Sequence, residues 1–140
     1  MEMEIKKQKS ISAAAKIIVQ SRYTIALIGA GLSVGSGIPT FRGAGGLWTK
    51  LGEPPNNGYE NFLADPKAWW DQNLNSEVDP ERTQFREAIE KAKPNPGHLA
   101  LVDLEKLNIL KHQITQNIDN LHYIAGSKNV TEIHGNRIKL

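Results

Sequence analysis

The sequence of 140 residues predicts a single α/β domain in which helices flank a parallel β-sheet. Helix-like and strand-like segments alternate along the chain, which is the order that a parallel sheet requires. An apolar run of strand length, Tyr23–Gly29, ends in glycine and is typical of a buried parallel strand. Three later segments open with Asp-Pro or Asn-Pro, a pair that is typical of a helix start.

The expected elements follow one another along the whole chain. They are a helix over 10–21, the buried strand over 23–29, an aperiodic region over 29–58, helices opening at Pro66, Pro80 and Pro96, a strand over 109–117, a short helix ending at Gly126, and a third strand from 129 to the loop at 134–135. The helix from Pro96 carries an apolar stripe of Leu99, Val102, Leu104 and Leu107. The alternation from Arg137 to Leu140 predicts one more strand that is cut short.

Composition excludes several classes of function. The hydrophobic fraction of 39% and the charged fraction of 23% are ordinary for a globular protein. The net charge of +2 is too small to indicate a nucleic-acid or anionic membrane partner. Cysteine is absent, so the chain has no disulfide, cysteine-ligated metal or cysteine nucleophile, and its scattered histidines predict no metal site. No apolar run approaches the ~20 residues of a membrane span, and no signal peptide is recognisable, so we expect a cytoplasmic protein.

Each predicted strand ends in polar or glycine-rich sequence. The three ends are Gly29-Ala30-Gly31, Gln116-Asn117 and His134-Gly135. Ligands of parallel sheets bind outside the carboxyl ends of the strands. We therefore expect these three ends to converge on one crevice.

The first strand end is compatible with a phosphate. Gly29 and Gly31 allow a tight turn and close approach of backbone N–H groups, although a flexible turn fits the sequence equally well. Val34 stands where the usual dinucleotide fingerprint has its third glycine, so an ordinary dehydrogenase site is not predicted. Arg42 could hold a phosphate or ribose oxygen, or point into solvent. Phe41 could wall a flat ring or anchor the loop.

The other two strand ends offer amide, carboxylate and imidazole groups. Gln116, Asn117 and Asp119 suit ribose hydroxyls and a carboxamide, while helix capping is the alternative for Asn117 or Asp119. His134 could act as a general base near neutral pH, the alternative being a structural histidine. The remaining histidines, His98, His112 and His122, are expected in packing or surface positions.

Four motifs in this order, "GAGLSVGSGIPTFRG", "GGLW", "TQNIDNLH" and "IHGN", resemble the sirtuin family of NAD-dependent protein deacylases from about Ser12 to Asn136. The resemblance implies a Rossmann-like sheet that binds NAD as a co-substrate. It also implies transfer of the acyl group from an acyl-lysine protein or peptide to ADP-ribose, with release of nicotinamide. Thr40 occurs in the branch of the family that contains desuccinylases, but those enzymes also use a Tyr-x-x-Arg pair, and the matching region near Gln72–Asn75 has neither residue. Acetyl-lysine is therefore the default substrate.

The resemblance also implies a role for each matching position. The pyrophosphate turn would be lined by Gly29, Ala30, Gly31 and Ser33, with Val34 nearby, and the nicotinamide ribose and phosphates would be bordered by Phe41 and Arg42. Ribose hydroxyls would contact Gln116, and the nicotinamide pocket would be formed by Asn117, Ile118 and Asp119. The general base would be His134, so that His134 and Asn117 are the expected catalytic pair.

Sirtuins continue beyond the His-Gly motif into a cysteine-ligated zinc module and the adenosine-binding half, and neither is present in these residues. Residues 1–140 are therefore expected to be the N-terminal portion of the NAD-binding catalytic domain, an incomplete Rossmann-like fold. We expect the chain alone to be catalytically weak or inactive, and to self-associate through the uncovered sheet. The alternatives are a non-enzymatic NAD or ADP-ribose binder and an NADase that uses water in place of the peptide.

Overall fold

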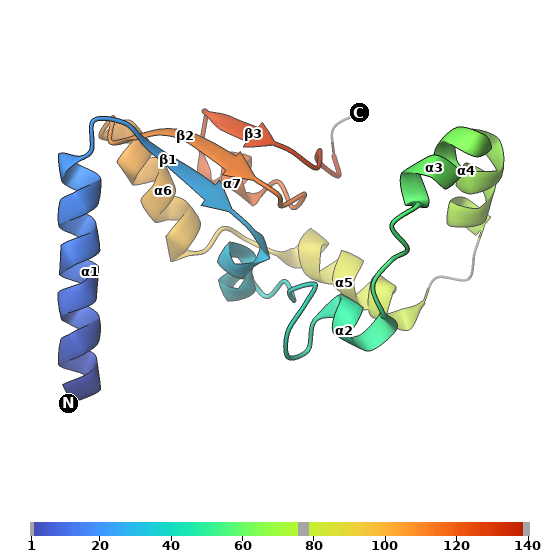
Figure 1. Ribbon diagram of the computed structural model, residues 1–140, viewed down its shortest axis with the longest axis horizontal. Coiled ribbons are helices and arrows are strands. Elements are labelled where there is room, and N and C mark those ends of the chain that lie inside the picture. The colour runs from blue at the N-terminus through green and yellow to red at the C-terminus, as the bar shows by residue number, and fades with distance from the viewer. Residues whose placement is uncertain (1, 76–78, 139–140) are drawn as a thin grey trace. The chain divides into compact units, whose positions relative to one another are not determined.

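The computed structural model describes residues 2–75 and 79–138 (Figure 1). They divide into two compact units, Met1–Ser33 with Lys93–Leu140 and Val34–Ala92. The first unit contains the sheet and the second is helical.

The sheet has three strands, β1 (Thr24–Ile28), β2 (Leu110–Thr115) and β3 (Val130–Glu132), in the order β1-β2-β3. Both pairings are parallel, which confirms the predicted α/β class. In the register of the strands, Ile28 lies opposite Thr115, and Thr115 lies opposite Glu132. All three strands therefore end at the same level of the sheet.

The helices of this unit are α1 (Glu2–Gln20), α6 (Pro96–Lys106) and α7 (Leu121–Ala125), and the 3-10 helix η1 (Ala30–Ser36) follows β1. α6 packs against β2 and α7. The predicted start of α6 is confirmed, because the Asn95 side chain accepts a hydrogen bond from the Gly97 N–H at 2.9 Å. The predicted end of α7 is also confirmed, with Gly126 in the left-handed region at φ 109°.

Burial in this unit differs from the sequence prediction. Only Ile28 of β1 is buried, whereas the side chains of Ile25 and Leu27 are 53% and 73% exposed. On α6 the predicted stripe is buried at Val102 but exposed at Leu99 and Leu107. The apolar pattern identified the elements correctly, but these side chains point to faces that no described residue covers.

Two predicted boundaries are wrong for local reasons. The first helix begins at Glu2 rather than near residue 10, because the Glu, Lys and Gln residues before Ser10 are good helix formers. Arg137 and Ile138 form a turn rather than a strand, since the Asn136 side-chain oxygen accepts a hydrogen bond from the Ile138 N–H at 3.0 Å. Lys139 and Leu140, the rest of that predicted strand, lie outside the described residues.

The second unit consists of α2 (Leu47–Leu51), α3 (Gly58–Ala64), α4 (Pro66–Asn75) and α5 (Pro80–Lys91), with α2 packed on α5 and α3 on α4. Asp65 accepts a hydrogen bond from the Ala68 N–H at 2.9 Å, and Asp79 from the Glu81 N–H at 2.8 Å, so both predicted Asp-Pro helix starts are confirmed. The region 29–58, expected to lack regular structure, contains η1 and α2, each too short to show a period in the sequence.

None of the helices in the described ranges combines the length and apolar character needed to cross a lipid bilayer.

Candidate functional site

The carboxyl ends of the three strands meet at one edge of the sheet, as the sequence predicts. The Gln116 N–H donates to the Ile28 carbonyl at 3.0 Å, and the Ile133 N–H donates to the Thr115 carbonyl at 3.0 Å. Beyond the strands, the Arg137 N–H donates to the Ile118 carbonyl at 3.3 Å. The segments after β1, β2 and β3 are thus hydrogen-bonded to one another as they leave the sheet.

A buried polar network joins the glycine turn to the segment after β2. Ser33 Oγ donates to Asp119 Oδ2 at 2.6 Å, and Asn117 Nδ2 donates to Ser33 Oγ at 3.1 Å and to the Gly29 carbonyl at 3.2 Å. Ser33 is 1% exposed and Asp119 8%. Asp119 Oδ1 also accepts from the Leu121 N–H at 3.0 Å, so the aspartate supports the start of α7 as well.

The backbone after β2 is bent by its own side chains. Thr115 Oγ1 accepts from the Asn117 N–H at 3.0 Å, which turns the chain out of the strand. Asn120 then adopts a left-handed conformation at φ 66°, which asparagine tolerates better than most residues, and α7 begins at the next residue. Gln116 is exposed at the edge of the sheet, and Ile118 is half-buried.

His134 lies in the turn that follows β3 and its side chain is exposed. Gly135, at φ 76°, closes this turn by donating its N–H to the Glu132 carbonyl at 3.2 Å. The next residue, Asn136, donates its side-chain N–H to Asn120 Oδ1 at 2.9 Å and also to Glu132. Asn136 therefore fixes the histidine turn against the start of α7, a role that the motif "IHGN" carries but that sequence reasoning did not assign.

A second buried network, missed in the sequence, lies behind the strand ends. Gln113 is fully buried on β2, and its side-chain amide donates to Ser127 Oγ at 2.9 Å. His122 Nδ1 lies 2.9 Å from Gln113 Oε1, and because an amide oxygen only accepts, this nitrogen carries the hydrogen. The sequence gives no clear signal for this network, because β2 also contains the polar residues Lys111, His112 and Thr115.

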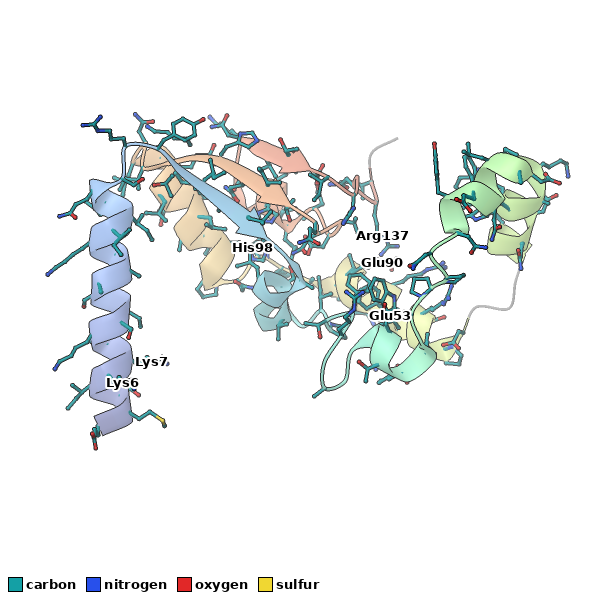
Figure 2. The ribbon with its side chains drawn as sticks, in the orientation of Figure 1. Lys6, Lys7, Glu53, Glu90, His98 and Arg137 are labelled. Carbon is teal, nitrogen blue, oxygen red and sulfur yellow. The ribbon has the colours of Figure 1, made fainter. Side chains whose placement is uncertain are left out.

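His98, labelled in Figure 2, packs edge-on against His122 with 5.3 Å between ring centroids. Burial lowers the pKa of both imidazoles, and the charge of His98 lowers the pKa of His122 further, whereas Asp119 acts in the opposite direction on both. Both rings are therefore held neutral near physiological pH. The packing role predicted for these two histidines is confirmed, while His112 bonds the exposed Thr131 hydroxyl at 2.7 Å.

Val34, Phe41 and Arg42 belong to the other unit. Val34 is exposed, and Phe41 packs on Trp48 and Phe85 with ring centroids 4.8 and 5.3 Å apart. Phe41 therefore anchors its loop, which was the structural alternative for it. The Arg42 side chain is exposed, and its guanidinium carbon lies 4.6 Å from the centre of the Trp48 ring.

Metal chemistry finds no support in the described part of the chain, where no three His, Asp or Glu side chains gather as a ligand set. The predicted site is thus an assembly of amide, hydroxyl, carboxylate and imidazole groups.

Known proteins of one family are similar to this chain in sequence. The family model described as "Sir2 family" matches residues 29–140. An NAD-dependent protein deacetylase of Caldivirga maquilingensis is 48% identical over 123 residues, which are 88% of this chain and 44% of that protein. An NAD-dependent protein deacylase of Pyrococcus furiosus is 46% identical over 126 residues, or 90% of this chain and 47% of that protein. The chain spans about half the length of the curated relatives it matches.

The chain is also similar to solved structures. A Sir2 homologue mutant in complex with ADP-ribose superposes with a TM-score of 0.64 at 41% identity, covering 86% of this chain and 45% of that one. A Sir2 mutant with a deacetylated p53 peptide and 3'-O-acetyl ADP-ribose gives a TM-score of 0.67 at 35% identity, covering 90% and 47%.

Proposed function

The chain belongs to the Sir2 family, and on this premise we propose that it forms the nicotinamide side of the active site of an NAD-dependent protein deacylase. The observation that carries the proposal is the buried contact of Ser33, Asn117 and Asp119, which come from two strand ends and meet at the edge where His134 leaves the sheet. The sirtuin resemblance assigns Asn117 and Asp119 to the nicotinamide pocket, His134 to the base and Ser33 to the pyrophosphate turn.

The donor set fits a nicotinamide group. Asp119 Oδ2 accepts from Ser33 and Oδ1 accepts from the Leu121 N–H, and a carboxylate oxygen accepts about two hydrogen bonds, so each can take a further N–H from a carboxamide. A nearly buried carboxylate also attracts the positively charged pyridine ring of NAD more strongly than an exposed one would. Ile118, half-buried beside it, supplies apolar contact for the ring.

NAD supplies the glycosidic bond that is broken and the ADP-ribose that receives the acyl group. The roles of the protein are to bind and to move a proton. Asn117 and Asp119 hold the carboxamide, Gln116 contacts the ribose hydroxyls, and His134 takes a proton from one of these hydroxyls. An imidazole is the side chain most often used for such a proton transfer, and the exposure of His134 leaves it within reach of a substrate.

Zinc does not fit the described residues, which offer no ligand set, so no step is assigned to it. The curated relatives are about twice as long as the region matched. The proposal is therefore that the 140 residues alone turn over NAD weakly or not at all, and that an acyl-lysine peptide binds with the help of segments outside them. A nucleic-acid partner is not part of this proposal.

The binding half of the proposal is tested by calorimetry with nicotinamide on the 140-residue chain. Asp119→Asn should weaken nicotinamide binding about ten- to a hundredfold, because a hydrogen bond to a charged group contributes roughly 1.5–3 kcal/mol. His112→Ala, which changes a residue of the same sheet away from the strand ends, should leave this binding unchanged. Equal affinity of the wild-type and Asp119→Asn chains for nicotinamide would refute the proposed pocket.

The catalytic half is tested by following NAD and an acetyl-lysine peptide with the chain alone and with the chain fused to the unmatched C-terminal part of one of the longer relatives. Deacetylation that depends on the added segment and is lost in His134→Ala supports the proposal. Release of nicotinamide without peptide supports the NADase alternative, and binding without turnover in either form supports the non-enzymatic one. Deacetylation by the 140 residues alone, at a rate near that of the longer relatives, would contradict the expected inactivity.

A further inference from the structure

Arg42 is held from two directions within its own unit. Its Nε donates to Glu53 Oε1 at 2.6 Å, and a second guanidinium nitrogen donates to Glu53 Oε2 at 3.0 Å. The guanidinium also lies over the Trp48 ring, 4.6 Å from its centre. The Nε edge of the guanidinium, which can bind two oxygens of a phosphate, is thus occupied by a carboxylate, while one face rests on the indole.

The loop backbone fixes this arrangement. Leu47 donates its N–H to the Thr40 carbonyl at 3.0 Å and Trp48 to the Phe41 carbonyl at 2.8 Å. Gly46 permits the close approach, because a Cβ at that position would lie 2.7 Å from the Phe41 carbonyl oxygen. The Trp48 ring is therefore held beside Arg42 by the course of the main chain.

The way in which α2 ends places Glu53 beside Arg42. Gly52 ends this helix at φ 83°, a value that glycine adopts without strain, and its N–H donates to the Trp48 carbonyl at 2.9 Å. The chain reverses at this glycine, and the next residue, Glu53, meets Arg42 (Glu53 is labelled in Figure 2).

We propose that Glu53 acts as a displaceable latch, which occupies one edge of the Arg42 guanidinium until a phosphate group, such as one of ADP-ribose, takes its place. The inference rests on the proposed function, since an NAD-dependent deacylase meets ligands that carry phosphate groups. It assigns to Glu53 a regulatory role, setting how tightly the phosphate-bearing part of the ligand is held. Trp48 has the complementary role, because it keeps the guanidinium in place when the carboxylate leaves.

The latch can open because both partners are exposed. The side chains of Arg42 and Glu53 are 66% and 58% accessible, and exposed ion pairs of this kind contribute little to stability. A phosphate presents the same pair of oxygen acceptors with more negative charge, so it competes effectively for the same N–H groups. Glu53 therefore weakens phosphate binding without preventing it.

The test is calorimetry with ADP-ribose on the 140-residue chain at low ionic strength. Glu53→Gln should bind ADP-ribose about two- to fivefold more tightly, the range that corresponds to a surface ion pair of roughly 0.4–1 kcal/mol. Glu87→Gln is the matched control, because Glu87 is an exposed glutamate of the same unit that pairs with Lys91 at 2.8 Å. It removes the same charge and should leave ADP-ribose affinity unchanged.

Three further measurements assign the effect to Arg42. In an Arg42→Ala background, Glu53→Gln should give no gain in ADP-ribose affinity. Nicotinamide, which has no phosphate, should bind Glu53→Gln and wild type equally. High salt should reduce the gain seen with ADP-ribose, since exposed charges are screened.

The outcomes separate this inference from the proposed function. If wild type binds ADP-ribose and Glu53→Gln binds it no more tightly, or if the gain persists without Arg42, the latch is overturned and the proposed site stands. If neither the wild-type nor the Glu53→Gln chain binds ADP-ribose, the proposed function is overturned together with the latch.

Discussion

Replacing Gln113 by methionine should cost this chain a large part of its stability, although the two side chains are similar in size. Gln113 is fully buried and makes hydrogen bonds of 2.9 Å to Ser127 Oγ and to His122 Nδ1. Each bond contributes about 1 kcal/mol net, and a buried group that loses its partner costs roughly 1–3 kcal/mol. We expect the free energy of unfolding to fall by about 2–4 kcal/mol, against typical totals of about 5–15 kcal/mol.

The assay is urea denaturation followed by far-UV circular dichroism. His112→Met is the control, because His112 is the neighbouring residue of β2 and bonds an exposed hydroxyl. Ser127→Ala should cost much less in the Gln113→Met background than in the wild type, since its hydroxyl has already lost that partner. A loss below about 0.5 kcal/mol in Gln113→Met, or full additivity of the two changes, would refute the reasoning.

Three further outcomes are expected. Burial lowers the pKa of His98 and His122 in the folded chain, so the unfolded chain binds more protons below pH ~6.5. The free energy of unfolding measured in urea should therefore fall as the pH drops through that value. A flat profile between pH 7 and 5 would contradict this. Gly46→Ala should open the loop around Phe41, at a cost of about 1–3 kcal/mol, and accelerate amide exchange there, whereas unchanged exchange would show that the backbone adjusts. Light scattering should find the wild-type chain self-associated through the exposed face of β1, and Leu27→Lys should shift it toward monomer; a monodisperse wild-type monomer would exclude this.

The predictions that succeeded rest on short-range chemistry. The helix starts at Pro66, Pro80 and Pro96 each depend on a carboxylate or amide within three residues, so the signal is complete in the local sequence. The meeting of the strand ends follows from the topology of a parallel sheet once the strands are recognised. Both kinds of inference need no knowledge of distant contacts.

The rest depends on long-range contacts that have no local signature. The hydrogen bond between Ser33 and Asp119 joins residues 86 positions apart, and no spacing rule reports it. The exposure of Leu27 could not be predicted from the sequence either, because an apolar run predicts a strand but not which residues cover it. The ion pair of Arg42 and Glu53 depends on the conformation of Gly52. The sequence shows the glycine, but not the direction in which the chain leaves it.

Thr115 occupies the level of the sheet at which all three strands end, paired with Ile28 on one side and Glu132 on the other. Side chains along a strand point alternately to the two faces of the sheet. Deleting one residue of β2 before this threonine would therefore move every side chain between the deletion and the following loop to the opposite face. Laboratory evolution by single-residue deletion should therefore find no functional variants within 110–115. In the segment 54–57, between α2 and α3, the chain length can drift, because no strand register depends on it.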